Sequence, residues 1–483
     1  MRSSWMSRHE NSGLDRRTLT TRRAYAHIEL LVGRPLSTKR FVIRKNTSHG
    51  PALLLMPQYT GTLAAARCLA AHGVPVVVAS SDLLAPALWS RYVSTRKICP
   101  NFLHGPLPVL EWLMRYGKSA PGTVLYPTCD ELAWIVARHR DDLAEWYQLY
   151  SPSLETLRAV LDKRELYAAC SALGIGVPQT WYPETEADVK WVARQVPVCL
   201  VKPRTQVFFN AHAKGSLAKG PEELLRVWRD YRFGEIAPEI LLDMRDGHVP
   251  MVQEYISGVS QGVWSVSGFI DQSGHLLGTI GSRKLLQLPR EAGVGVCFKT
   301  AEVPRHLVDQ VEALCRKLGY YGVFEVEFLR SGEQHLLIDF NPRYFGQMGF
   351  DIARGMELPW LAYLCATGQE HVAAEETLHP SSGQPEVNCF RDGVNLRWKL
   401  LAAAIAGAVS ARDAKRCLNC LSSPHPSHVD AYLMRSDPGP GAAAIAVTLW
   451  RTLRYPRGFW KSIRPVSPEH ASEASAQYCA EAE

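Results

Sequence analysis

The stretch Leu336-Leu-Ile-Asp-Phe-Asn-Pro-Arg-Tyr-Phe-Gly346 decides the fold of this chain, because an acid, an amide and a guanidinium follow an apolar run in close order. Leu336 to Ile338 predict a buried strand. Asp339 and Asn341 share one face of that strand, since side chains alternate between faces, and Pro342 ends the pairing. The stretch therefore predicts a polar site at the end of a buried strand.

The segment before it, Gly322–Leu329, also alternates, with Glu325 and Glu327 on one face. Ser331-Gly332-Glu333 predicts a turn, so the two runs form a β-hairpin. Glu327 then lies within a residue or two of the level of Asp339. Two carboxylates and the Asn341 amide oxygen suit Mg²⁺. The alternative is a solvated strand face, and we accept that interpretation for Glu333.

The composition is that of an ordinary soluble globular protein, with 483 residues, 46% hydrophobic and 21% charged. This length has room for several domains. The 12 cysteines are scattered, which favours reduced thiols and a cytoplasmic location. Cys417 and Cys420 form an isolated pair without further ligands, so we expect no zinc site there. No apolar run reaches the ~18 residues that a membrane helix requires.

The net charge of +7 comes largely from the two ends of the chain. Residues 1–49 are basic, show no clear periodicity and lack the apolar core of a signal peptide. We interpret them as a disordered extension. Nucleic-acid or membrane-surface contact is the alternative, and no specific nucleic-acid partner is expected.

Residues 50–150 predict an α/β domain. Pro51–Met56 and Val74–Ala79 predict buried strands on either side of a helix over Gly61–Ala71, and Thr123–Tyr126 predicts a further strand. A strand, helix, strand order implies a parallel sheet. The first turn lacks a complete G-x-G-x-x-G, so we expect acceptor-binding loops at the strand ends here and not cofactor chemistry.

A helical region follows over Ser153–Leu173, and it contains Lys163. The strand Val198–Val201 then ends in Lys202. A lysine at the end of a buried strand suits a phosphate, although a lysine that reaches water from a sheet edge is the alternative. The polar loop Thr205–Gly220, which contains Lys214, is a candidate cover for phosphates.

Met251–Ile256 predicts an alternating strand whose apolar side chains could face a flat base. Two more predicted strands, Ser265–Ile270 and His275–Ile280, precede Arg283 and Lys284. Adjacent cations invite an anion, and a solvated basic turn is the alternative.

Taken together, these motifs resemble the ATP-grasp superfamily, which includes biotin carboxylase, carbamoyl-phosphate synthetase and many carboxylate–amine ligases. The likeness runs from about Pro51 to Gln369 and rests on the order and spacing of the motifs. It implies an α/β architecture with a parallel-sheet pre-ATP-grasp domain over 50–150. An ATP-grasp domain of α+β type follows over 151–375, with nucleotide held between two subdomains.

The resemblance also implies a role for each matching residue. Nucleotide binding is implied for Lys163, Lys202, Lys214, Gln253, Glu254, Tyr255 and Ile256. Metal binding is implied for Glu327, Asp339 and Asn341, and contact with the γ-phosphate or an acyl-phosphate for Arg283, Lys284 and Arg343. Asp339 stands where most relatives carry a glutamate, and the phosphate-covering loop is not Gly-rich as it is in many relatives.

The implied activity is that of an ATP- and Mg²⁺-dependent ligase, with Mn²⁺ as an alternative metal. It activates a carboxylate as an acyl-phosphate and joins it to an amine or a related nucleophile, so the expected partners are small-molecule carboxylates and amines. The sequence looks most like a bacterial branch that includes D-aspartate ligases, which suggests cell-envelope or polysaccharide biosynthesis. A non-catalytic ATP-binding regulatory or scaffold module is the alternative, and a homodimer is a further expectation.

The C-terminal region over 376–466 is expected to be mostly helical, with a linker at 380–385 and a helix from Val394 to about Cys420. Ala442–Arg457 mixes aromatic and basic side chains. We favour a helix packed on the body of the protein, and peripheral contact with an anionic membrane is the alternative. Residues 467–483 are expected to be a disordered tail.

Overall fold

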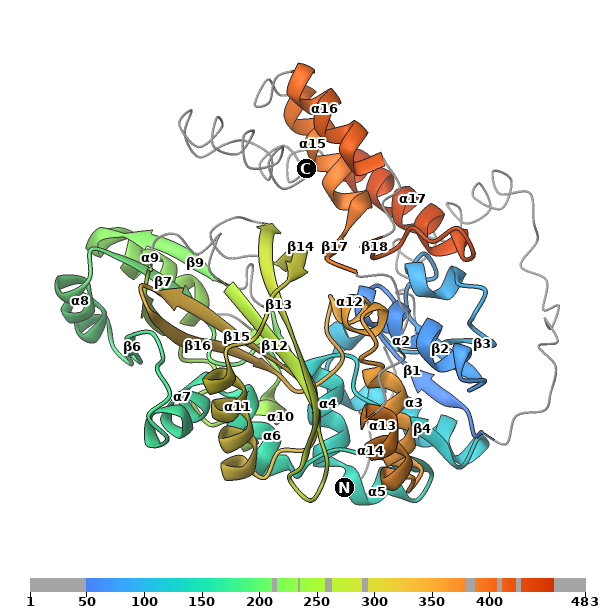
Figure 1. The fold of residues 1–483 in the computed structure, drawn as a ribbon. Helices are drawn as coiled ribbons and strands as arrows, with labels where there is room; N and C mark the ends of the chain where they lie inside the picture. Colours follow the sequence, from blue (N-terminus) through green and yellow to red (C-terminus); the bar gives the residue numbers. More distant parts are fainter. Residues whose placement is uncertain are drawn as a thin grey trace, which may run out of the picture. The chain divides into compact units, whose positions relative to one another are not determined.

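A computed structural model describes residues 49–210, 215–232, 235–256, 263–288, 294–378, 387–405, 411–422 and 427–455 (Figure 1). All of them belong to one unit, Thr47–Glu483. The predicted extension, Lys214, the predicted linker at 380–385 and the predicted tail lie outside the described residues, apart from His49 at the end of the extension.

The first sheet is parallel and has five strands in the order β3-β2-β1-β4-β5, as predicted for an α/β domain. Its strands are β1 (Ala52–Leu54), β2 (Val76–Ser80), β3 (Thr95–Ile98), β4 (Thr123–Leu125) and β5 (Tyr147–Leu149). The predicted helix is α2 (Thr60–Ala71). The other helices are η1 (Pro86–Trp89), η2 (Phe102–His104), α3 (Pro106–Ser119), α4 (Asp130–Arg138) and α5 (Arg140–Ala144). Gly61 lies so close to the chain after the hairpin that an added Cβ would be 2.3 Å from the carbonyl oxygen of Phe345.

A second sheet has four strands in the order β6-β11-β7-β9. The strands are β6 (Thr180–Trp181), β7 (Val198–Lys202), β9 (Ser216–Lys219) and β11 (Met251–Glu254). Val201 and Val252 pack with Val192 and Trp228 from the covering helices α8 (Glu186–Gln195) and α9 (Gly220–Arg232). Nearby lie β8 (Phe209–Asn210), which pairs with β10 (Glu235–Ile236), and α10 (Pro238–Asp243).

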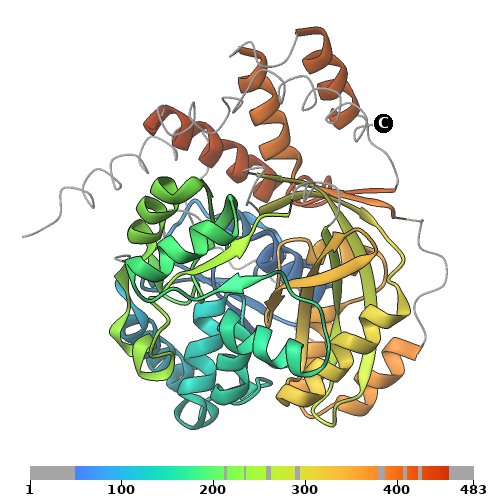
Figure 2. The same cartoon turned by 90° about the vertical axis from the view of Figure 1, so that its left-hand side faces the viewer.

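The third sheet has seven strands in the order β16-β15-β12-β13-β14-β17-β18, and its strands can be followed in Figures 1 and 2. They are β12 (Val263–Ile270), β13 (Leu276–Leu288), β14 (Val294–Thr300), β15 (Gly322–Ser331), β16 (Gln334–Asn341), β17 (Cys389–Arg391) and β18 (His428–Asp430). The predicted hairpin is β15–β16, with Glu327 directly opposite Asp339. Gly332 turns the chain with a φ of 61°.

Helices accompany this sheet. They are α11 (Arg305–Leu318), α12 (Met348–Ala353), α13 (Leu358–Ala366) and α14 (Glu370–Leu378). Leu307, Val311 and Leu314 of α11 share a buried cluster with Val266, Phe324 and Phe328 of the sheet. The apolar side of the hairpin is therefore covered, and its polar side is left for chemistry.

Two predictions need correction. The helical region over Ser153–Leu173 is two helices, α6 (Leu154–Leu161) and α7 (Lys163–Ala172), because the buried Asp162 leaves the helical conformation to cap α7. The alternative of a basic turn at Arg283 and Lys284 is wrong, since β13 continues through both residues to Leu288.

The C-terminal region contributes α15 (Gly393–Ile405), α16 (Ala411–Ser422) and α17 (Pro438–Arg454) in addition to β17 and β18. The buried Asp437 stands at the N-cap position of α17, and its carboxylate accepts hydrogen bonds from Arg67 Nε at 2.9 Å, Ser90 Oγ at 2.7 Å and the Arg91 amide at 2.9 Å. This helix therefore begins against the first domain. None of the helices in the described ranges has the length and apolar character needed to cross a bilayer.

Candidate functional site

A cavity of about 810 Å³ is lined by loops of the first sheet, by the four-stranded sheet and by the seven-stranded sheet. Most of the sequence-predicted site residues line it: Lys163, Lys202, Gln253, Glu254, Tyr255, Ile256, Lys284, Glu327, Asp339, Asn341 and Arg343. Arg283 is not among the lining residues, and Lys214 lies outside the described part of the chain. Residues up to 180 positions apart in the sequence thus meet in one hollow.

The β15–β16 ladder gathers the acids, because Glu327 pairs with Asp339 and Glu325 pairs with Asn341 on the same face. Glu325 is 1% exposed. It accepts hydrogen bonds from Ser265 Oγ, from Asn341 Nδ2 at 2.5 Å and from Gln347 Nε2 at 2.9 Å. Burial and the neighbouring Glu327 carboxylate raise the pKa of Glu325 to about 8.

Glu325 and Gln347 were missed as site residues. The alternation of β15 put Glu325 on the face of Glu327, which was the available signal. Gln347 lies beyond the strand and carried no periodic signal.

Two lysines balance the acids. Lys284 Nζ donates to Glu327 Oε1 at 2.6 Å, and Lys163 Nζ donates to Asp339 Oδ1. Burial lowers the pKa of Lys284, but the attraction of Glu327 outweighs it, so the pKa is raised above its ordinary value. The carboxylate oxygens of Glu327 and Asp339 are hard ligands of the kind that Mg²⁺ prefers. A bound cation would also reduce the repulsion between these like-charged carboxylates. The residues present therefore fit a divalent metal.

Lys202, at the end of β7, forms no ion pair with a carboxylate among the described residues, although Asp339 and Glu327 lie near enough to act on its charge. Its ammonium donates to Gln253 Oε1 at 3.1 Å, and Gln253 Nε2 donates in turn to Tyr167 Oη at 3.2 Å and Thr180 Oγ1 at 3.1 Å. Burial and the positive charge of Lys163 lower the pKa of Lys202 to about 8. A partly buried ammonium that donates to an amide oxygen is suited to receive an anion.

Lys163 is positioned by a buried ion pair beneath it. Arg204 donates from Nε to Asp162 Oδ1 at 3.1 Å and from Nη2 to Asp162 Oδ2. The amide of Lys163 donates to the carbonyl of Arg204 at 3.0 Å. The start of α7 is thereby fixed to the chain that follows β7, which brings Lys163 and Lys202 to the same cavity.

The strand β11 leads from Gln253 to Glu254, Tyr255 and Ile256, which all line the cavity. The Glu254 carboxylate accepts the Gln179 amide at 2.8 Å, and the Glu254 amide donates to the Gln179 carbonyl at 3.0 Å. The side chain of Glu254 therefore secures the neighbouring segment. Backbone groups after it remain as candidates for contact with a base edge.

Arg343 links the hairpin to the first domain. Its Nε donates to Asp130 Oδ1 at 2.7 Å and its Nη2 donates to Asn341 Oδ1 at 2.7 Å. Burial lowers the pKa of Arg343, and the stronger effect of Asp130 raises it. Asp130 is the first residue of α4, which follows β4. The loop between this strand of the parallel sheet and α4 therefore contributes to the cavity.

Arg283 does not line the cavity, whereas its neighbour Lys284 does. It pairs with Trp264 and Lys299 in the ladder, whereas Lys284 pairs with Val263 and Phe298. Successive side chains of a strand point to opposite faces, so Lys284 reaches the cavity and Arg283 is directed away from it. The geometry thus does not support a phosphate contact for Arg283.

No protein-family model matches the chain. A D-aspartate ligase from Enterococcus faecium is 21% identical over 306 residues, which are 60% of this chain and 70% of that protein. The biotin carboxylase domain of a Hydrogenobacter thermophilus 2-oxoglutarate carboxylase, solved with MgADP, ADP and bicarbonate, is similar with a TM-score of 0.52 and 14% identity, over 67% of this chain and 70% of that one. An L-amino acid ligase from Bacillus licheniformis has a TM-score of 0.51 and 14% identity, over 66% of this chain and 76% of that one.

The chain has the ATP-grasp fold. A Staphylococcus aureus N5-carboxyaminoimidazole synthetase solved with ADP is also similar, with a TM-score of 0.50 and 12% identity over 67% of this chain and 78% of that one. The fold predicted from the motif order is confirmed.

The cavity of this ATP-grasp fold has a further wall, which the motifs did not indicate. Asp392, Asn395 and Lys399 of the β17–α15 segment line it, together with Tyr432 after β18 and Arg451 of α17. These residues come from the region beyond the sequence likeness. They were missed because they lie on a short strand and on helices far along the chain, where no sequence pattern connects them with the motifs of the cavity.

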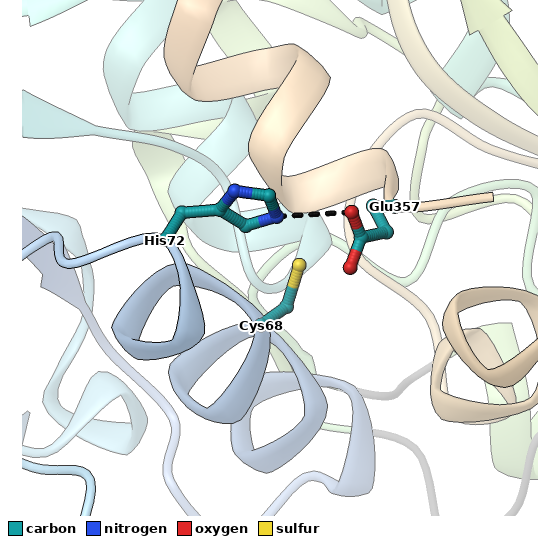
Figure 3. Close-up of side chains that lie close together, drawn as sticks. All are labelled: Cys68, His72 and Glu357. Carbon is teal, nitrogen blue, oxygen red and sulfur yellow. Dashed lines mark hydrogen bonds and ion pairs between the residues drawn. The ribbon is translucent and has the colours of Figure 1, made fainter. Parts of the chain in front are cut away.

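A separate side-chain group joins α2 to the start of α13 (Figure 3). His72 Nε2 and Glu357 Oε2 are 2.9 Å apart, and the Cys68 thiol lies beside them. The His72 ring is stacked on Trp360 with ring centres 4.3 Å apart, and burial raises the pKa of Cys68. The imidazole is already bonded and stacked, so we interpret this group as a packing contact between two helices.

Proposed function

We propose that this protein is an ATP- and Mg²⁺-dependent ligase that activates a carboxylate as an acyl-phosphate and joins it to an amine or a related nucleophile. The observation that carries the proposal is the cavity, which paired carboxylates on β15–β16 line together with the partly buried Lys202 and Lys163. The likeness to a D-aspartate ligase and an L-amino acid ligase supports an ATP-dependent ligase in general.

In this proposal Lys163 and Lys202 hold the phosphates, and backbone groups of Tyr255 and Ile256 meet the base. Glu327, Asp339, Asn341 and the newly recognised Glu325 would hold Mg²⁺ or, as an alternative, Mn²⁺. A metal held there would supply positive charge that offsets the charge of the phosphates. Lys163 and Lys284, which pair with Asp339 and Glu327, lie beside the same acids and would add to that positive charge.

The acceptor carboxylate attacks the γ-phosphorus of ATP, and the bond to the ADP oxygen breaks. The amine nitrogen then attacks the acyl carbon, phosphate leaves and the amine loses a proton. Arg343 and Lys284 line the cavity, and the role proposed for them is positioning and electrostatic stabilisation of the charge on the transferring group. A role in cell-envelope or polysaccharide biosynthesis is part of the same proposal.

The test is ADP release measured across pairs of acids and amines. We expect release that requires both substrates and that is lost in Asp339→Ala while the circular dichroism spectrum is kept. Glu333→Ala, an exposed acid at the tip of the same hairpin, is the matched control and should retain turnover. A folded protein that binds no ATP with Mg²⁺ would refute the proposal. Binding without acceptor-dependent ADP release would favour the alternative, a non-catalytic regulatory or scaffold module.

We also propose peripheral contact of α17 with an anionic membrane. Leu449, Trp450 and Leu453 lie on this helix with exposed fractions of 39%, 50% and 79%, and Arg454 follows them. Apolar and basic side chains together suit the surface of an anionic bilayer. Sedimentation with phosphatidylglycerol vesicles, compared with phosphatidylcholine vesicles, tests this contact, and equal binding to both or to neither contradicts it. The expected homodimer is tested by light scattering.

A further inference from the structure

The C-terminal wall of the cavity is joined to the seven-stranded sheet. Phe390 of β17 pairs with Phe298 of β14, and the Asp392 amide donates to the Val296 carbonyl at 2.8 Å. The Asp392 carboxylate then accepts the Asn395 amide at 3.1 Å and Asn395 Nδ2 at 2.6 Å, which fixes the first turn of α15. The start of α15 is thus fixed to a strand that lines the cavity.

One face of α15 looks into the cavity. Asn395 and Lys399 are four residues apart, so they lie one above the other on the helix, and both line the hollow. Trp398 Nε1 donates to Thr452 Oγ1 at 2.9 Å and ties α15 to α17. The residues next to this bond, Lys399 and Arg451, both line the cavity.

These two cations are not paired with an acid in the part of the chain that the structure describes. Among the described residues, neither Lys399 nor Arg451 forms an ion pair, whereas the acids of this region are engaged elsewhere. Asp392 is held by Asn395, and Asp430 accepts the amides of Tyr432 and Leu433 and lies 3.9 Å from Arg397. Burial lowers the pKa of Lys399 with no carboxylate to offset it. A partly buried ammonium without a partner is costly unless a ligand supplies the charge.

We propose that Lys399 and Arg451, with Asn395, form a subsite for a second anionic group of the substrate, a carboxylate or a phosphate separate from the carboxylate that reacts. The inference rests on the proposed ligase function and adds the substrate class, which is an acceptor with at least two acidic groups. In the proposed function the phosphates of ATP are held by Lys163, at the start of α7, and Lys202, at the end of β7, so the C-terminal cations are left for the acceptor.

Binding of simple anions tests the subsite without requiring turnover. Calorimetry is performed on the full chain saturated with Mg²⁺ and a non-hydrolysable ATP analogue, with succinate and inorganic phosphate as separate probes. We expect saturable binding of at least one probe, weakened about tenfold or more in Lys399→Met and in Arg451→Met, because a charged hydrogen bond is lost. The better probe identifies the anion as carboxylate or phosphate.

Arg454→Met is the matched control, since Arg454 lies on the same helix and is exposed, as Arg451 is, but does not line the cavity. Lys399→Arg should restore binding if charge is the cause. The proposal is overturned if neither probe binds, if Arg454→Met has the same effect, or if Lys399→Met and Arg451→Met weaken binding of the ATP analogue as much as that of the probe.

The ligase proposal is judged separately by the acid- and amine-dependent release of ADP. Within that assay, acids with a second acidic group should react in preference to their neutral counterparts, for example aspartate over asparagine. A preference for the neutral member overturns the subsite while leaving the ligase proposal intact. Absence of any ADP release refutes the ligase, and the anion titration still decides whether the subsite exists.

Discussion

The pKa of Lys202 gives the site a pH dependence whose size can be worked out. Burial and Lys163 lower the pKa to about 8 from the ordinary 10.5. The charged form is therefore lost as pH rises through about 8, whereas bound phosphates keep the ammonium protonated to higher pH. Nucleotide affinity then falls by the factor 1 + 10^(pH − 8), which amounts to about a tenfold loss between pH 7 and pH 9.

The assay is titration of the protein with MgADP across this pH range, with circular dichroism to confirm the fold at each pH. Lys202→Arg keeps the charge at all of these pH values, so its affinity should stay flat. Lys202→Met should bind weakly at pH 7, near the level that the unaltered protein reaches at high pH. A tenfold pH effect that persists in Lys202→Arg would show that another group titrates, and the reasoning about Lys202 would fail.

Three further changes should act on stability. Arg204→Met leaves Asp162 buried without its partner and should lower the free energy of unfolding by about 3–5 kcal/mol in urea titrations; an unchanged midpoint would contradict a structural role for the pair. Asp437→Ala removes the acceptor of three donors at the start of α17, so limited proteolysis should cut the C-terminal region faster than in the unaltered protein. Gly61→Ala should cost about 1–3 kcal/mol by overpacking, whereas Gly346→Ala, whose added Cβ would meet its nearest atom at 3.5 Å, should cost less.

Local patterns predicted most of the strands, because the alternation of apolar and polar residues can be recognised within each strand alone. The alternation of Gly322–Leu329 and the turn at Gly332 fixed the hairpin register closely enough to place Glu327 opposite Asp339. The break at Asp162 was not predictable in this way. It depends on Arg204, whose position 42 residues later is set by the tertiary fold.

Residue types and strand faces were enough to predict most of the candidate residues that line the cavity, but they could not distinguish between neighbouring residues. Arg283 and Lys284 look equivalent in the sequence, and only the phase of β13 against β12 decides which one reaches the cavity. Glu325 was on the correct face, but its burial beneath Ser265 and Gln347 depends on three separate segments. Sequence spacing predicts which face of a strand a residue occupies, whereas the burial of that residue depends on how the segments pack together.

The C-terminal region shows why the substrate is harder to predict than the nucleotide. The residues proposed to bind the nucleotide lie at the start of α7 and at the ends of β7 and β11, and similar solved structures match about two thirds of the chain. The opposite wall depends on β17, a strand of three residues that carries little periodicity of its own. Without β17, β14 would be left as an exposed edge and Phe298 would lose its contact with Phe390. The same pairing that completes the sheet brings Asn395 and Lys399 to the cavity, so assigning the acceptor requires the C-terminal region to be treated as part of the site.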